Sequence, residues 1–122
     1  MHTYGFDRTV VTAAPPEFVD ITSQVEDALE ASPVADGQVT ITAPPGCAII
    51  VNEFESGLLS DIKRTLERLG ATSNGSEPRI GAVSVVLPAS EGRLRLGRWQ
   101  RLLLVELEKS TERSVSIQVV GD

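Results

Sequence analysis

Acidic side chains offer most of the chemistry that this sequence could perform. Four of them stand in or beside segments with a regular pattern: Glu53, Glu55, Asp61 and Glu106. Carboxylates act as general acids or bases when their surroundings tune their pKa values. Glu106 is the most unusual, because it lies inside the apolar run Leu-Leu-Leu-Val-Glu-Leu-Glu. Two interpretations of Glu106 stay open: an exposed or arginine-paired side chain, and an acid or base that faces a pocket.

Two further polar sites are equally ambiguous. Asn52 and Glu53 follow an apolar segment and precede a predicted helix, so they could cap that helix or contact a ligand. Trp99 and Gln100 follow Gly97, and Trp99 is the only tryptophan in the chain. Trp99 could pack in a core or an interface, or it could serve as a stacking platform for a ligand.

Four arginines lie close together in the same part of the sequence: Arg93, Arg95, Arg98 and Arg101. They could meet a single anion. Alternation along a strand would send Arg93 and Arg95 to one face, but Gly97 interrupts the pattern before Arg98. The sequence therefore leaves open whether these arginines cooperate.

Histidine and cysteine chemistry is poorly supported. His2 is the only histidine and Cys47 the only cysteine, so a pair of the two would have to recruit His2 from the chain terminus. Cys47 lies in an apolar stretch, which favours a small core residue. No metal-ligand cluster, P-loop or dinucleotide-binding glycine motif occurs in the sequence. We therefore expect neither a cofactor nor a metal.

Size and charge narrow the class of protein. The 122 residues fit a single domain over residues 1–122, and the net charge of −6 with no basic run makes nucleic acid an improbable partner. No apolar run approaches the roughly 20 residues that span a bilayer, so we expect no membrane partner. A lone cysteine and the lack of a leader-like N-terminus favour the cytoplasm.

The patterning predicts an α+β fold with a largely antiparallel sheet or sandwich and two helices. The first helix is expected from Thr22 to Pro33, with a capping box between Ser23 and Glu26. The second is expected after Asn52 or Ser56 as a cap, with an apolar stripe. Its members are Leu58, Leu59, Ile62, Leu66 and Leu69.

Strands are expected around residues 4–13, 18–21, 38–42, 47–51, 80–87, 94–96, 100–107 and 114–120, with a linker at 71–79. Residues 102–105 and 115–120 are expected to need cover on both faces. We expect two helices to be too few for this, so a neighbouring subunit could supply the rest.

Several segments together resemble the YjbQ-like family of small bacterial and archaeal proteins. They are Ile-Thr-Ser-Gln-Val-Glu-Asp-Ala-Leu (21–29), Asp-Gly-Gln-Val-Thr-Ile (36–41), Ala-Ile-Ile-Val-Asn-Glu (48–53), Ser-Val-Val-Leu-Pro (84–88) and the run from Gly92 to Glu108. The Gly-x-Trp-Gln element at residues 97–100 is the most specific. The resemblance implies a mostly antiparallel α+β fold and a homotrimer with sites near subunit boundaries. The family is often labelled secondary thiamine-phosphate synthase.

The chain departs from this family at one corner. Pro44 occupies the place of a histidine, Pro45 and Gly46 take positions of hydroxyl residues, and Cys47 replaces an alanine. Two further histidines of the family have no counterpart in the short segment 71–79, and only Arg113 remains of two arginines in a later turn. Proline offers no titratable group and no N–H. We therefore expect the Pro-Pro-Gly corner to be a scaffold rather than part of a working site.

Three hypotheses follow. The first is a non-catalytic trimeric homologue that binds a protein or a small molecule such as an anion. The second is an enzyme acting on a small phosphorylated substrate, with Glu53, Asp61 and Glu106 as acids or bases and Arg93, Arg98 or Arg113 as the phosphate contact. The third is a structural subunit that joins catalytically complete chains. The predicted ligand-binding residues are Asn52, Glu53, Asp61, Trp99, Gln100, Glu106 and Arg113, with no catalytic residue assigned.

Overall fold

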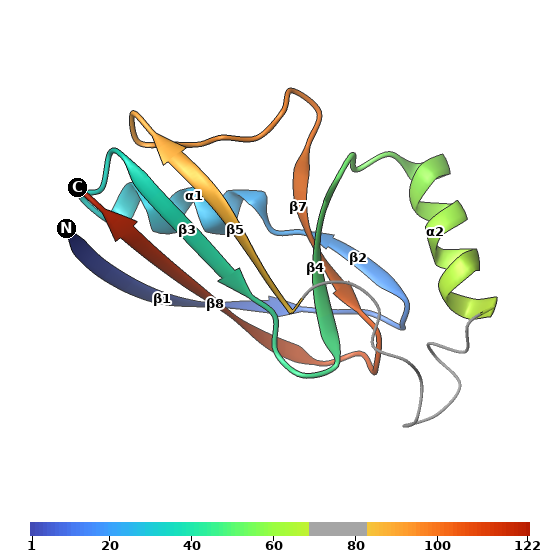
Figure 1. Cartoon of the computed structure of the whole chain (residues 1–122). Helices are drawn as coiled ribbons and strands as arrows, with labels where there is room; N and C mark the ends of the chain where they lie inside the picture. The colour runs from blue at the N-terminus through green and yellow to red at the C-terminus, as the bar shows by residue number, and fades with distance from the viewer. Residues whose placement is uncertain (69–82) are drawn as a thin grey trace.

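The computed structural model describes residues 1–68 and 83–122, and it confirms the α+β class (Figure 1). The strands in this part are β1 (His2–Val11), β2 (Glu17–Asp20), β3 (Gly37–Thr42), β4 (Cys47–Asn52), β5 (Ser84–Ser90), β6 (Arg93–Leu94), β7 (Arg101–Glu106) and β8 (Glu112–Gly121). The helices are α1 (Thr22–Ala31) and α2 (Ser56–Arg68). Neither helix is long and apolar enough to cross a membrane.

The strands form two antiparallel sheets. The five-stranded sheet has the order β1-β8-β3-β5-β6, and the three-stranded sheet has the order β2-β7-β4. β1 and β8 pair along their whole length, from His2 opposite Gly121 to Val11 opposite Glu112. This pairing brings the chain ends together (Figure 1). The N-terminal amine lies 2.8 Å from the Asp122 carboxylate.

The main core lies between the two sheets and α1. On β8 the side chains alternate, so that Val115, Ile117 and Val119 are buried while Ser116 and Gln118 are exposed. α1 contributes Val25, Ala28 and Leu29 to the same core. Within the described chain the second face of β8, with Ser116, Gln118 and the half-buried Val120, has no covering element, so the expectation that residues 115–120 need cover on both faces stays a prediction.

The three-stranded sheet, by contrast, is covered on both faces as expected. Leu102, Leu103 and Leu104 of β7 are fully buried, since one face meets the main core and the other meets a smaller cluster under α2. Leu66 is the residue of α2 that is buried in this cluster, together with Ala48 and Val105. The other described members of the predicted stripe are half-buried, and Leu69 lies outside the described residues.

Both predicted helix caps are wrong in detail. α1 begins at Thr22, so Ser23 is already helical, and the Asp20 carboxylate accepts the Thr22 N–H at 3.0 Å. At α2 the Glu55 carboxylate accepts the N–H groups of Gly57 and Leu58 at 2.9 and 2.7 Å. An acidic group before the first turn satisfies N–H groups that lack a partner inside the helix.

Two strand boundaries also differ from the pattern. In the described chain the strand expected at residues 80–87 begins at Ser84 and continues through Pro88 to Ser90, while residues 80–82 and the expected linker 71–79 lie outside the described residues. The expected strand at 94–96 shrinks to Arg93–Leu94. The turn between them is confirmed, with Glu91 at φ 55° and Gly92 at φ 77°, as a tight hairpin turn requires.

Gly37 should be indispensable to the β3–β8 pairing. A Cβ at Gly37 would lie 2.0 Å from the backbone oxygen of Val120, whereas a Cβ at Gly5 in β1 would meet nothing within 4 Å. We predict that Gly37→Ala lowers the free energy of unfolding by about 2 kcal/mol or more, and that Gly5→Ala leaves it unchanged or raises it by roughly 0.5 kcal/mol. Urea unfolding of both variants measures this, and equal midpoints would contradict the register.

Candidate functional site

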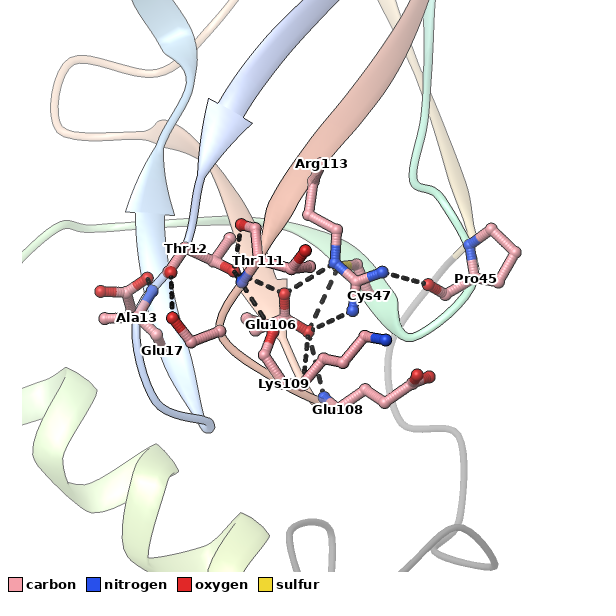
Figure 2. A network of polar contacts seen from close by, with 11 residues as sticks. Thr12, Ala13, Glu17, Pro45, Cys47, Glu106, Glu108, Lys109, Thr111 and Arg113 are labelled. Atoms are coloured by element: carbon pink, nitrogen blue, oxygen red, sulfur yellow. Dashed lines mark hydrogen bonds and ion pairs between the residues drawn. The ribbon is translucent and has the colours of Figure 1, made fainter.

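Glu106 is fully buried at the end of β7, where the two sheets meet (Figure 2). Its Oε1 accepts hydrogen bonds from the Thr12 hydroxyl and from Arg113 Nε, both at 2.7 Å. Its Oε2 accepts from Arg113 Nη2 at 2.8 Å and from the backbone N–H groups of Glu108 and Lys109 at 3.0 and 3.3 Å. The arginine-paired interpretation of Glu106 is thus confirmed, and every acceptor direction of the carboxylate is used.

The Pro-Pro-Gly corner contacts the other side of Arg113. Arg113 Nη1 donates to the Pro45 carbonyl at 3.1 Å (Figure 2). Gly46 has φ +89°, and a Cβ there would lie 2.9 Å from Arg113 Nη2. The Pro44 carbonyl accepts the Cys47 N–H at 3.1 Å and closes the turn. The corner therefore holds the guanidinium against Glu106.

The electrostatics of this network make Glu106 a fixed anion. Burial by itself raises the pKa of Glu106, but hydrogen bonds from Arg113, Thr12 and two backbone N–H groups outweigh it and lower the pKa to about 2. Burial, together with the nearby Glu106 carboxylate, raises the pKa of the Cys47 thiol to about 12. Cys47 is a buried core residue, as expected. Near neutral pH neither group is poised to exchange a proton.

A cleft of about 670 Å³ lies at the opposite end of the same strands. In the β4–β7 pair Cys47 is opposite Glu106 and Asn52 is opposite Arg101, so the two ends are about 17 Å apart. We call the cleft at the Asn52–Arg101 end the Trp99 cleft. Its lining residues are Glu53, Phe54, Glu55, Arg98, Trp99 and Arg101.

A tight turn presents the aromatic ring of this cleft. The Gly97 carbonyl accepts the Gln100 N–H at 3.0 Å, and the Gln100 side chain accepts the Gly97 N–H at 2.6 Å. Arg98 and Trp99 occupy the two central positions. Trp99 is 65% exposed, and the guanidinium carbon of Arg98 lies 5.0 Å from its ring centroid. Packing of Trp99 in the core is therefore wrong for this chain, while the interface and stacking interpretations remain.

Two charged groups of the Trp99 cleft are already engaged. Arg101 Nε lies 2.7 Å from Asp20 Oδ2. Burial raises the pKa of Asp20, but hydrogen bonds from Thr22 and Arg101 outweigh this and lower it. The helix N–H groups that Glu55 accepts lower the pKa of that carboxylate. Arg101 and Glu55 therefore shape the wall rather than offer open charges.

The structure divides the predicted site residues into three places. Asn52, Glu53, Trp99 and Gln100 gather at the cleft end, but only Glu53 and Trp99 line the cleft, because the side chains of Asn52 and Gln100 accept the N–H groups of Glu53 and Gly97. Glu106 and Arg113 lie at the buried end. Asp61 is exposed on α2 in an ion pair with Arg64. A single site that unites Glu53, Asp61 and Glu106 is thus not assembled in this chain.

Several contributing residues have no local signal in the sequence. Thr12 reaches Glu106 across 94 positions of the chain. Phe54, which follows β4, lines the cleft without any signal in the sequence, whereas Arg101, the first residue of β7, is one of the four arginines considered above. Only the pairing of β4 with β7 brings them together. Among the described residues, no three His, Cys, Asp or Glu side chains gather closely enough to hold a metal ion.

Comparison with known proteins identifies the family. The family model described as UPF0047 protein YjbQ-like matches residues 7–122. The chain belongs to the YjbQ-like family. A UPF0047 protein of Archaeoglobus fulgidus is 34% identical, in an alignment that covers 93% of this chain and 99% of the relative. Another, of Methanothermobacter thermautotrophicus, is 31% identical and covers 99% of this YjbQ-like chain and 94% of its own length.

Solved structures support the same family. A YbjQ-like protein of unknown function from Sulfolobus solfataricus superposes with a TM-score of 0.86 at 30% identity, covering 99% of each chain. A hypothetical protein from Aeropyrum pernix gives a TM-score of 0.85 at 30% identity over 100% of both chains. The resemblance to the YjbQ-like family described above is thus confirmed.

The Glu106 network should make the free energy of unfolding depend on pH under acidic conditions. The pKa of Glu106 falls from an ordinary 4.5 to about 2, so its contribution is fully present above pH 4.5 and is lost as the pH falls toward 2. We predict that Glu106→Gln costs on the order of 3 kcal/mol at pH 7 and that the gap to the parent narrows between pH 4.5 and 2. Urea unfolding across this range measures the gap. Glu26→Gln, an exposed change on α1, should show no such gap, and a constant gap for Glu106→Gln would refute the account.

Proposed function

We propose that this YjbQ-like chain is a non-catalytic, ligand-binding member of its family, one domain that binds a small anionic molecule in the Trp99 cleft. The observation that carries this proposal is the Arg98 guanidinium held beside the exposed Trp99 ring in a cleft of about 670 Å³. Small-molecule sites typically have a volume of roughly 300–1,000 Å³ and combine apolar walls with a few polar groups.

The buried end supports the non-catalytic part of the proposal. A general acid or base needs a titratable group that can reach substrate. Glu106 is fully buried and its oxygens are occupied by Arg113, Thr12 and backbone N–H groups. Pro44 occupies the position at which the resemblance described above implies a histidine, and its ring cannot move a proton. This end therefore serves the fold.

Arg98 supplies the anion contact. Within the described residues it forms no ion pair, whereas Arg101 is paired with Asp20. A guanidinium binds carboxylate or phosphate through two parallel N–H groups, and stacking on an aromatic face leaves those groups available. Trp99 thus holds Arg98 in place for an incoming anion.

Binding can be followed through Trp99 itself, because it is the only tryptophan. We predict that phenyl phosphate, a probe with a ring and an anionic group, changes the fluorescence of the chain with saturation. Arg98→Ala should weaken this binding about tenfold, since hydrogen bonds to charged groups contribute roughly 1.5–3 kcal/mol. Arg64→Ala, on α2 and outside the cleft, is the matched control. Equal affinity in Arg98→Ala and the parent would refute the proposed site.

A second candidate function is an enzyme with a carboxylate and an arginine acting on a small phosphorylated substrate, as the thiamine-phosphate synthase label of the family suggests. Glu53 and Arg98 share the Trp99 cleft, which favours this candidate. Hydrolysis of phenyl phosphate to phenol and inorganic phosphate that disappears in Glu53→Gln would establish action on a phosphorylated substrate over simple binding.

We further propose that the chain assembles as a homotrimer in the cytoplasm. The outer face of the five-stranded sheet leaves Val11 75% and Val86 54% exposed among small polar side chains. No helix in the described part of the chain packs on this face, because α1 and the second sheet lie on the other one. By strand alternation this face also carries Asp7 and Glu112, but most of its side chains are uncharged, and a sheet face with exposed valines is suited to a second copy.

Light scattering tests the assembly. We predict a mass near 39 kDa, three times the 13.1 kDa of one chain. Val86→Glu should shift the mass toward that of a single chain, because it places a charge in the proposed contact. Ser60→Glu adds the same charge on the exposed surface of α2 and should leave the mass unchanged. A mass of 13 kDa for the parent chain would exclude the trimer.

A further inference from the structure

The charged groups of the Trp99 cleft are not equally available. Of the four that line it, Arg101 is paired with Asp20, and Glu55 accepts two N–H groups at the start of α2. Glu53 and Arg98 remain. Within residues 1–68 and 83–122 neither the Glu53 carboxylate nor the Arg98 guanidinium has a hydrogen bond or ion pair, and the guanidinium lies over the Trp99 ring. The cleft therefore offers one open negative charge and one open positive charge.

Apolar surface accompanies these two charges. Trp99 is 65% exposed and Phe54 is 52% exposed, and both line the same cleft as Glu53 and Arg98. Large exposed aromatic side chains beside a cleft are typical of a contact surface. A ligand body that covers them removes apolar area from water.

The cleft has one unpaired charge of each sign, and this restricts the charge of the ligand more than the requirement for an anionic group alone. A ligand with negative charge alone would pair with Arg98 and place that charge in the same small cleft as Glu53, where like charges repel. A ligand that also carries a positive group would pair with both. The side chains of the cleft are complementary to a molecule with one charge of each sign.

We propose that the ligand of the Trp99 cleft is a small zwitterion: its carboxylate or phosphate binds Arg98, its ammonium group binds Glu53, and its apolar body covers Trp99 and Phe54. This inference rests on the proposed binding function and specifies its ligand class. Glu53 is then a specificity residue, because it distinguishes a zwitterion from a simple anion of the same shape. Arg98 is the anchor that both kinds of molecule share.

A matched pair of probes tests the role of the ammonium group. L-Phenylalanine and 3-phenylpropionate share a phenyl ring and a carboxylate, and only the first has an ammonium group. Titration followed by Trp99 fluorescence should show L-phenylalanine binding at least about threefold more tightly, the effect of one partly exposed ion pair. O-Phosphoethanolamine and ethyl phosphate form a second pair, which shows whether a phosphate replaces the carboxylate.

Variants of Glu53 make the test specific. Glu53 is exposed in a loop, so its replacement should leave the fold intact. Glu53→Gln should bring the affinity ratio of each pair to about one, and Glu53→Lys should reverse it in favour of the simple anion. Asp61→Asn, which removes an exposed carboxylate on α2, should keep the ratio of the parent.

The two proposals can fail separately. If 3-phenylpropionate and phenyl phosphate bind through Arg98 but the ammonium group adds nothing, or if Glu53→Gln leaves the ratio unchanged, the zwitterion inference is overturned and the binding function stands. If none of the probes binds, or if Arg98→Ala has no effect, the binding function is refuted and the inference falls with it.

Discussion

A carboxylate that is fully removed from water destabilises the fold by several kcal/mol unless it is neutralised and hydrogen-bonded. Glu106 imposes this requirement at the point where the two sheets meet. Arg113 at the start of β8 and Thr12 after β1 both belong to the five-stranded side, whereas Glu106 ends β7 in the other sheet. Satisfying one buried charge therefore fixes how the two sheets join, and it consumes the hydrogen-bonding capacity that a reactive carboxylate would need.

The two ends of the β4–β7 pair have different roles: one end stabilises the fold, and the other has side chains that a ligand can contact. At the buried end of β4 and β7, the Pro45–Gly46 corner holds Arg113 against Glu106. At the other end, Trp99 is mostly exposed and Arg98 covers its ring without an ion pair in the described chain. A family fold can keep its architecture while its chemistry changes, so the function of this YjbQ-like chain has to be argued from the open end.

Much of the fold could be predicted because its signals are local. The β-branched alternation, the Glu91-Gly92 turn and the Gly-x-Trp-Gln element each depend on residues close in sequence. The prediction of the α2 cap was wrong because Glu55 and Ser56 are both polar residues at the predicted start of the helix. Only the folded geometry shows that the Glu55 carboxylate accepts the first free N–H groups. The sequence could not identify Thr12 as a hydrogen-bond partner of Glu106, since the two residues lie 94 positions apart. The cleft required knowing that Asn52 is opposite Arg101, which no pattern in either strand reveals.

A double-mutant cycle between Glu106 and Arg113 tests the central claim most directly, with the free energy of unfolding as the measured quantity. Glu106→Leu and Arg113→Met should each be strongly destabilising, because each leaves the other charge buried without its partner. The double variant should recover much of the loss, giving a coupling of about 2 kcal/mol or more. Additive effects, with a coupling near zero, would show that this pair does not hold the two sheets together.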